Sequence, residues 1–169
     1  MMFKRLSTKL IVTLFALLLL VDRFSKAGES RRASIYGHYL ANTRHINNWD
    51  LVDISAPKIL GRYLLEKDKG ILFKFAVSKN LWERRIAIIS TQEFIKNNNF
   101  KTTLQIASML IKDEHDLIHK AVGWMLREIG KKDIALEEKF LRVHYKEMPR
   151  TMLRYAIEKF PETKRKKYL

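Results

Sequence analysis

The chain has 169 residues, about the size of one domain and enough to bury a substantial core. It carries 33 Lys and Arg against 18 Asp and Glu, a formal net charge of +15, which favours nucleic acid or an anionic membrane surface over an acidic protein as its partner. The absence of Cys excludes disulfides, thiolate metal sites and cysteine nucleophiles, and six Gly with three Pro are few for Rossmann folds, P-loops or turn-rich β-sandwiches.

The first segment is basic over residues 1–9 and then apolar over residues 10–21. The apolar run has 12 residues, fewer than the ~20 that a helix needs to span a bilayer. It imitates a signal peptide, but residues 22–24 follow it without a clean cleavage pattern. We therefore predict a buried helix of a cytoplasmic globular domain, in which Leu17 packs against a helix around residues 35–40. A secreted or membrane-tethered helical protein is the alternative.

The rest of the chain has helical spacing nearly throughout, and no segment alternates between apolar and polar residues like a half-buried strand. Short polar breaks divide it into about nine helices. We predict a single all-α domain over residues 1–169 that ends in a basic, solvated tail at residues 162–169. The breaks fall at residues 26–29, 47–48, 67–70, 97–99, 130–133 and 147–149.

A repeat of about 34 residues runs through these helices. Arg85, Lys120 and Arg154 each stand just before a small Ala in an apolar helix, and they lie 35 and 34 residues apart. Asp53 lies 32 residues before Arg85. A period of this size with two helices per unit indicates an α-solenoid of the HEAT or armadillo kind. We predict a right-handed superhelix of antiparallel helix pairs, in which these four side chains form one column along the concave surface.

Residues near the column have side chains suited to binding. Trp49 and Asp53 are four residues apart and share a helix face, where an aromatic plane beside a carboxylate can hold a sugar or a cation. The alternative is a carboxylate that favours the helix dipole beside a Trp of the core. Trp124 follows Lys120 by four residues and either stacks on nucleic acid or belongs to the core. Arg85 and Lys120 are phosphate ligands or solvated basic residues.

The segment from His115 to His119 has the spacing of the zinc motif H-E-x-x-H, with Asp in place of Glu. Asp is one methylene shorter than the Glu that serves as a general base, and the sequence offers no third ligand. We therefore predict no metal site, with His115 near a helix start and His119 among solvated polar residues. No Gly-rich phosphate loop or G-x-S-x-G motif is present, so we expect no small-molecule cofactor.

Four blocks, at residues 48–53, 80–87, 119–128 and 148–156, together resemble the DNA alkylation repair family of AlkD-like glycosylases, which are built from HEAT-like repeats. The resemblance begins at about Ala16 and continues to the C-terminus. It implies excision of cationic alkylated purines, such as 3-methyladenine and 7-methylguanine, from duplex DNA without flipping the base into a pocket. It also implies a monomer whose partner is duplex DNA with alkylated bases, and no cofactor.

Carried over onto matching positions, the resemblance implies that Asp53 is the catalytic carboxylate and that Trp49 and Trp124 are the two site tryptophans. The phosphate-contacting arginine of the family falls on Arg85. The full set of residues that we assign to DNA binding is Arg84, Arg85, Lys120, Arg127 and Arg154.

The chain also departs from the family, whose members begin with several more helices before the apolar one. We expect a protein that is short at its N-terminus, with a reduced DNA-binding surface and an uncapped first repeat that exposes apolar side chains. A noncatalytic HEAT-type module that binds nucleic acid or protein is therefore the alternative function.

Overall fold

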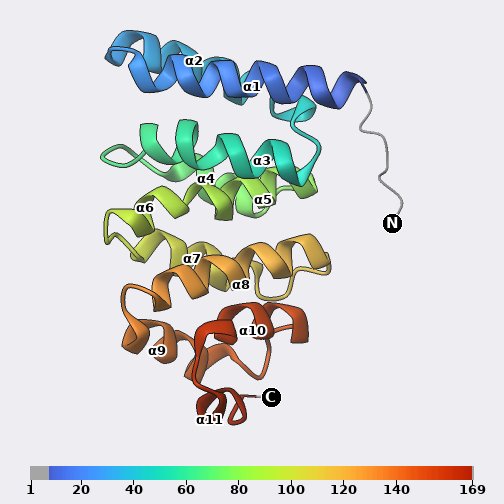
Figure 1. Ribbon diagram of the computed structural model, residues 1–169, viewed down its shortest axis with the longest axis vertical. Helices are drawn as coiled ribbons and strands as arrows, with labels where there is room; N and C mark the ends of the chain where they lie inside the picture. Colours follow the sequence, from blue (N-terminus) through green and yellow to red (C-terminus); the bar gives the residue numbers. More distant parts are fainter. Residues whose placement is uncertain (1–7, 169) are drawn as a thin grey trace.

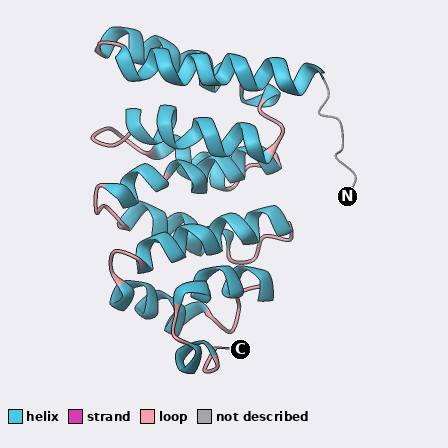
Figure 2. Cartoon of the chain, in the orientation of Figure 1, coloured by secondary structure: helices cyan, strands magenta, loops and turns pink. Residues whose placement is uncertain are grey.

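The computed structural model describes residues 8–168, and within this range the chain forms helices and loops but no strand (Figure 2). This confirms the all-α prediction. The described residues form eleven α-helices rather than about nine, and the two extra ones are short, α6 with five residues and α11 with four. The helices are α1 (Thr8–Lys26), α2 (Glu29–Ala41), α3 (Trp49–Ala56), α4 (Gly70–Ala76), α5 (Leu81–Ser90), α6 (Gln92–Lys96), α7 (Lys101–Leu110), α8 (Asp116–Gly130), α9 (Ile134–His144), α10 (Arg150–Ala156) and α11 (Glu162–Arg165).

The helices stack in chain order along the long axis of the molecule, from α1 and α2 at one end to α10 and α11 at the other (Figure 1). Helices α1, α3, α5, α8 and α10 contact one another in this order and form one layer. Helices α2, α4, α7 and α9 alternate with them along the chain and pack against this layer. The predicted repeat is visible in its small residues, because Ala56, Ala87, Ala121 and Ala156 are all fully buried, one on each of α3, α5, α8 and α10.

Polar side chains set the starts of the helices that carry the candidate site. Asn48 accepts a hydrogen bond from the backbone N–H of Asp50 at the start of α3, and Asn80 accepts one from Trp82 at the start of α5. His115 accepts one from the backbone N–H of Leu117 and caps α8, as predicted for a residue near a helix start. Each cap satisfies a backbone donor that the first helical turn leaves unpaired, and so it fixes where the helix begins.

The second histidine of this segment is not simply solvated, because the ring Nε2 of His119 is hydrogen-bonded to the carbonyl oxygen of Asp113. Both histidines thus have structural roles around the start of α8. Within residues 8–168, no cluster of three or more His, Asp or Glu has the arrangement to hold a metal ion.

Helix α1 confirms that the apolar run is a helix, but the helix is buried on one face only and not throughout as predicted. Leu17 and Phe24 are buried, and α1 packs against α2, α3 and the π-helical segment Pro57–Gly61 that continues α3. None of the helices in the described part of the chain is both long and apolar enough to cross a membrane. Residues 1–7 of the basic N-terminal segment lie outside the described residues. The outer face of α1 exposes Ile11, Val12, Phe15, Leu18 and Leu19.

The packing of α1 leads to a stability prediction. Replacing Leu17, which is 7% exposed, with Asp should lower the free energy of unfolding by about 3 kcal/mol or more, because an unpaired charge enters the core. Leu19 is 62% exposed on the same helix, so Leu19→Asp is the matched control and should change stability by less than about 0.5 kcal/mol. Urea unfolding followed by circular dichroism measures both. Equal midpoints for Leu17→Asp and the unaltered protein would show that this face of α1 is not core.

The basic tail is largely exposed to solvent, as predicted, but it also folds back onto the solenoid. Residues 162–165 form α11, and Lys164 forms an ion pair with Glu138 of α9. The ring of Tyr168 meets the ring of Tyr145 edge-on, with centroids 5.5 Å apart. An aromatic residue near the end of the sequence thus anchors a segment whose charges alone indicated a solvated tail.

Glu137 on α9 is a buried carboxyl group, 1% exposed, and its Oε1 has no hydrogen-bond partner among residues 8–168. The pKa of Glu137 is raised from 4.5 to about 8, mainly by burial and also by the charge of the neighbouring Glu138, while Arg127 opposes the increase. The folded protein therefore holds a proton that the unfolded chain releases above its ordinary pKa. The contribution of Glu137 to the free energy of unfolding is therefore fully present below pH 4.5 and is lost as the pH rises towards 8.

We expect the free energy of unfolding to fall by about 2 kcal/mol or more between pH 5 and pH 8, since one pH unit corresponds to about 1.4 kcal/mol for one proton. Glu137→Gln is neutral at every pH and should remove this part of the pH dependence. Urea unfolding of both proteins across this range measures the difference. Parallel pH profiles would contradict the assignment of a protonated Glu137.

Candidate active site

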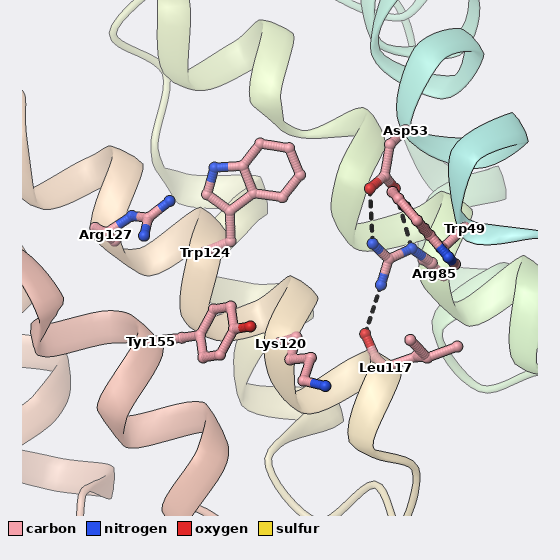
Figure 3. Close-up of a pocket in the computed structure, with 8 residues that line it drawn as sticks. All are labelled: Trp49, Asp53, Arg85, Leu117, Lys120, Trp124, Arg127 and Tyr155. Carbon is pink, nitrogen blue, oxygen red and sulfur yellow. Dashed lines mark hydrogen bonds and ion pairs between the residues drawn. The ribbon is translucent and has the colours of Figure 1, made fainter. Parts of the chain in front are cut away.

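A pocket of about 400 Å³ opens on the layer formed by α3, α5, α8 and α10 (Figure 3). Each of these four helices, which follow one another along the layer, contributes to it. Most of the residues singled out from the sequence therefore meet at one place, although they are up to 78 positions apart in the chain, from Trp49 to Arg127. The pocket is lined by Trp49, Asp53, Arg85, Leu117, Lys120, Trp124, Arg127 and Tyr155.

An ion pair between Asp53 and Arg85 forms one wall of the pocket. Arg85 Nε donates to Asp53 Oδ1 at 3.0 Å, and Arg85 Nη2 donates to Asp53 Oδ2 at 2.7 Å. A third hydrogen bond, of 2.6 Å, joins Arg85 Nη1 to the carbonyl oxygen of Leu117 on α8. The side chain of Arg85 is 6% exposed and that of Asp53 is 15% exposed. The guanidinium therefore donates three of its five N–H groups to other protein atoms, and its two bonds to Asp53 hold the carboxylate in one orientation.

The environment of Asp53 acts on its protonation in two opposing ways. Burial raises the pKa of Asp53 above its ordinary value of 3.8, and the nearby Asp50 adds to the increase. The hydrogen bonds and positive charge of Arg85 oppose this increase. Asp53 is thus a partly desolvated carboxylate whose negative charge depends on Arg85, and its remaining exposed surface faces the pocket.

The two predicted tryptophans stand on different sides of the pocket (Figure 3). Trp49 is 50% exposed, so the alternative of a core Trp is wrong at this position. Trp124 is partly buried and packs against the core, and its indole N–H donates a 3.1 Å hydrogen bond to Glu128. An exposed indole and an oriented indole therefore flank a space in which a flat or apolar group can lie.

The cations of the pocket each have an acidic partner. Lys120 forms a 2.6 Å ion pair with Asp116, and the hydrogen bond that it donates to this carboxylate raises the pKa of Lys120. Arg127 pairs with Glu158 of the segment after α10 and lies 3.8 Å from a carboxylate oxygen of Glu128. A phosphate entering the pocket must compete with these carboxylates. The pair of Lys120 is exposed and therefore weak, whereas the side chain of Arg127 is only 18% exposed.

Comparison with known proteins places this site in a family. The model of the DNA alkylation repair enzyme family matches residues 12–160, a region that contains every residue of the pocket. The chain belongs to the DNA alkylation repair enzyme family. A solved structure from Enterococcus faecalis, described as a predicted DNA alkylation repair enzyme, matches with a TM-score of 0.67 at 18% identity, over 87% of this chain and 67% of that chain. No curated protein matches.

Membership of the DNA alkylation repair family supports an enzyme with a DNA repair role. It confirms the resemblance drawn from the four sequence blocks, which placed the start of the similarity at about Ala16. The E. faecalis structure shares the fold of this chain.

Two arginines assigned to DNA binding in this family member lie away from the pocket. Arg84 donates to Asp113 at 2.6 Å and to the carbonyl oxygens of Ser78 and Lys79, so it ties the start of α5 to the segment before α8. Arg154 is exposed on α10 but does not line the pocket. Of the four residues predicted to form one column, Asp53, Arg85 and Lys120 line the pocket together, and Arg154 does not.

Sequence reasoning missed two contributors to the site. Tyr155 stands directly before the buried Ala156, just as Lys120 stands directly before Ala121, so the repeat itself carried the signal for its position. The spacing of basic residues pointed to Arg154 instead. The other missed contributor is the backbone carbonyl of Leu117, which binds Arg85 and leaves no trace in the side-chain pattern.

Proposed function

We propose that this DNA alkylation repair family member is a DNA glycosylase that excises cationic N-alkylated purines, such as 3-methyladenine and 7-methylguanine, from duplex DNA. One observation carries the proposal. A carboxylate, Asp53, is held by a bidentate arginine in a pocket whose other walls carry two indole rings. That arrangement suits a reaction in which positive charge develops on a sugar.

In the proposed reaction, the bond between C1′ of the deoxyribose and the ring nitrogen of the base breaks. The electron pair goes to the positively charged base, which leaves as a neutral molecule without a general acid. The sugar becomes an oxocarbenium ion, as in glycoside hydrolysis, and the oxygen of a water molecule adds to C1′. Asp53 stabilises the cation and accepts the proton that the water loses. A charge pair at ~4 Å is worth about 4 kcal/mol at an effective dielectric constant of 20, or on the order of 10³-fold in rate.

The other pocket residues have positioning roles in this proposal. Arg85 orients the carboxylate and keeps it ionised, so it acts through Asp53 as well as through any phosphate that reaches its two remaining N–H groups. Trp49 and Trp124 pack against the sugar and backbone of the damaged nucleotide. Lys120 and Arg127 exchange their carboxylate partners for backbone phosphates, which position the duplex without reading its sequence.

The deciding experiment is release of 7-methylguanine from methylated duplex DNA by the purified protein, with Asp53→Asn as the paired variant. Release by the unaltered protein above the spontaneous rate supports the glycosylase. The alternative function, a noncatalytic HEAT-type binding module, predicts DNA binding with no release above that rate. Equal release with and without protein, under conditions where the protein is shown to bind the duplex, selects the module.

Affinity for undamaged duplex should fall steeply with salt, because a chain with a net charge of +15 displaces condensed counterions from DNA. We expect log K to fall linearly with log salt concentration, with a slope of about −0.9 for each phosphate neutralised. Lys120→Ala should make the slope shallower by about one contact. Fluorescence anisotropy with a labelled duplex measures both slopes. An affinity that does not respond to salt would rule out phosphate contact as the main source of binding.

A further inference from the structure

Tyr155 is an aromatic side chain in the pocket that neither the sequence pattern nor the reaction proposed above uses. It is 37% exposed and comes from α10, the last of the four helices that form the pocket. Figure 3 shows its ring beside Trp124 and Lys120, across the pocket from Asp53 and Arg85. A large aromatic surface is therefore presented to whatever ligand reaches Asp53.

The backbone holds Tyr155 in this place through Gly123 on α8. A Cβ at Gly123 would lie 2.4 Å from the carbonyl oxygen of Met152 and 2.6 Å from the Cβ of Tyr155. The two helices therefore approach more closely than any other residue at position 123 would allow. Because α10 lies directly against α8, the Tyr155 side chain emerges beside Lys120 rather than on the outside of the solenoid.

The indole ring of Trp124, which lies beside Tyr155, is fixed by a separate contact. The indole N–H of Trp124 donates to Glu128, one turn further along α8, at 3.1 Å. Two aromatic side chains of known orientation thus stand together on the side of the pocket opposite the carboxylate. Because the protein holds the indole of Trp124 and fixes the backbone position of Tyr155, a ligand that packs on the two rings loses little freedom in ordering them.

The pocket consequently has two chemically different sides. The side with Asp53 suits a positively charged sugar, and the side with Trp124, Tyr155 and Lys120 suits a nucleotide through ring contact and one phosphate. We propose that Tyr155 contacts DNA, with its ring packed on the sugar or base of the nucleotide next to the one held at Asp53. This inference rests on the proposed function of the same pocket. Ring contact of this kind is tolerant of sequence, since every nucleotide offers a flat or apolar face.

The test is binding of a labelled duplex that contains a tetrahydrofuran abasic analogue, measured over a series of salt concentrations. Tyr155→Ala should weaken binding roughly tenfold at every salt concentration and leave the slope unchanged, because an uncharged contact releases no counterions. Tyr155→Phe keeps the ring and should bind like the unaltered protein. Lys120→Ala is the contrasting variant, which should make the slope shallower by about one contact. Tyr155→Leu keeps the packing close to the helix but lacks the ring, so it should lose as much affinity as Tyr155→Ala. It serves as the second variant if Tyr155→Ala is too unstable to measure.

Three results would overturn the inference: unchanged binding by both Tyr155→Ala and Tyr155→Leu, a loss in Tyr155→Phe as large as in Tyr155→Ala, or a shallower salt slope in Tyr155→Ala. The last would mean that the substitution acts by displacing Lys120. Arg154→Ala provides a further comparison, because Arg154 is the exposed neighbour of Tyr155 outside the pocket; any loss in this variant should come with a shallower salt slope, unlike the loss in Tyr155→Ala. The readout is binding, so it decides the role of Tyr155 even if base release fails and the glycosylase proposal falls.

Discussion

Asp53→Asn should slow the release of 7-methylguanine by about 10²- to 10³-fold, the usual effect of deleting one electrostatic contact to a transition state. The substitution keeps the shape of the side chain and removes its charge. Binding of undamaged duplex should hold or improve slightly, because an anion near the phosphates is lost. Single-turnover release at saturating protein separates the two effects, since it measures the chemical step after binding.

The rate of base release should also depend on pH. Burial raises the pKa of Asp53, and the reaction needs its ionised form, so base release should decline as the pH falls through that raised pKa. The decline should begin above the ordinary value of 3.8. In Asp53→Asn the residual release should lack this acidic limb. A pH profile with the same limb in both proteins would assign it to another group.

Asp50 is the matched control, because it lies in the first turn of α3 three residues before Asp53 and outside the pocket. Its charge raises the pKa of Asp53, so Asp50→Asn should shift the acidic limb slightly downwards and leave the plateau within a few-fold of the unaltered protein. Equal rates for Asp53→Asn and the unaltered protein would refute the assignment of the catalytic carboxylate. A loss in Asp50→Asn alone would mean that the register is wrong by one turn.

Arg85→Ala should have the second large effect, on stability and on rate together. Removing one partner of a buried ion pair leaves the other charge unpaired, and the free energy of unfolding should fall by about 3 kcal/mol. Release of 7-methylguanine should fall by about 10²-fold, because the carboxylate loses the group that orients it and keeps it ionised. Arg85→Lys should recover little of the rate, since an ammonium group cannot reproduce the bidentate contact.

A double-mutant cycle tells the two possible roles of Arg85 apart. If Arg85 acts through Asp53, the variant with both Asp53→Asn and Arg85→Ala should release base about as slowly as Asp53→Asn alone. If Arg85 instead contributes mainly by binding a phosphate, the two losses should multiply. Urea unfolding of each variant at the assay temperature verifies that the compared proteins are folded.

Much of the architecture could be predicted from the sequence because it depends on local periodicity. Apolar residues at helical spacing indicated an all-α fold, and the recurring small Ala indicated the repeat that stacks α3, α5, α8 and α10. The four-residue spacing of Trp49 and Asp53 put both on one face of α3 before any contact was known. The family blocks then associated those residues with DNA alkylation repair, which the family match supports.

The partners of the site residues were decided only by the tertiary structure. The sequence made Arg85 a candidate for phosphate, whereas packing of α3, α5 and α8 surrounds it with the carboxylate of Asp53 and the carbonyl of Leu117. At the end of the repeat the sequence held two conflicting signals, because the spacing of basic residues favoured Arg154 and the position directly before the small Ala favoured Tyr155. Successive residues point about 100° apart around a helix, so the choice depends on the rotation of α10 about its axis. That rotation follows from the close contact at Gly123, which no count of spacings along the chain can supply.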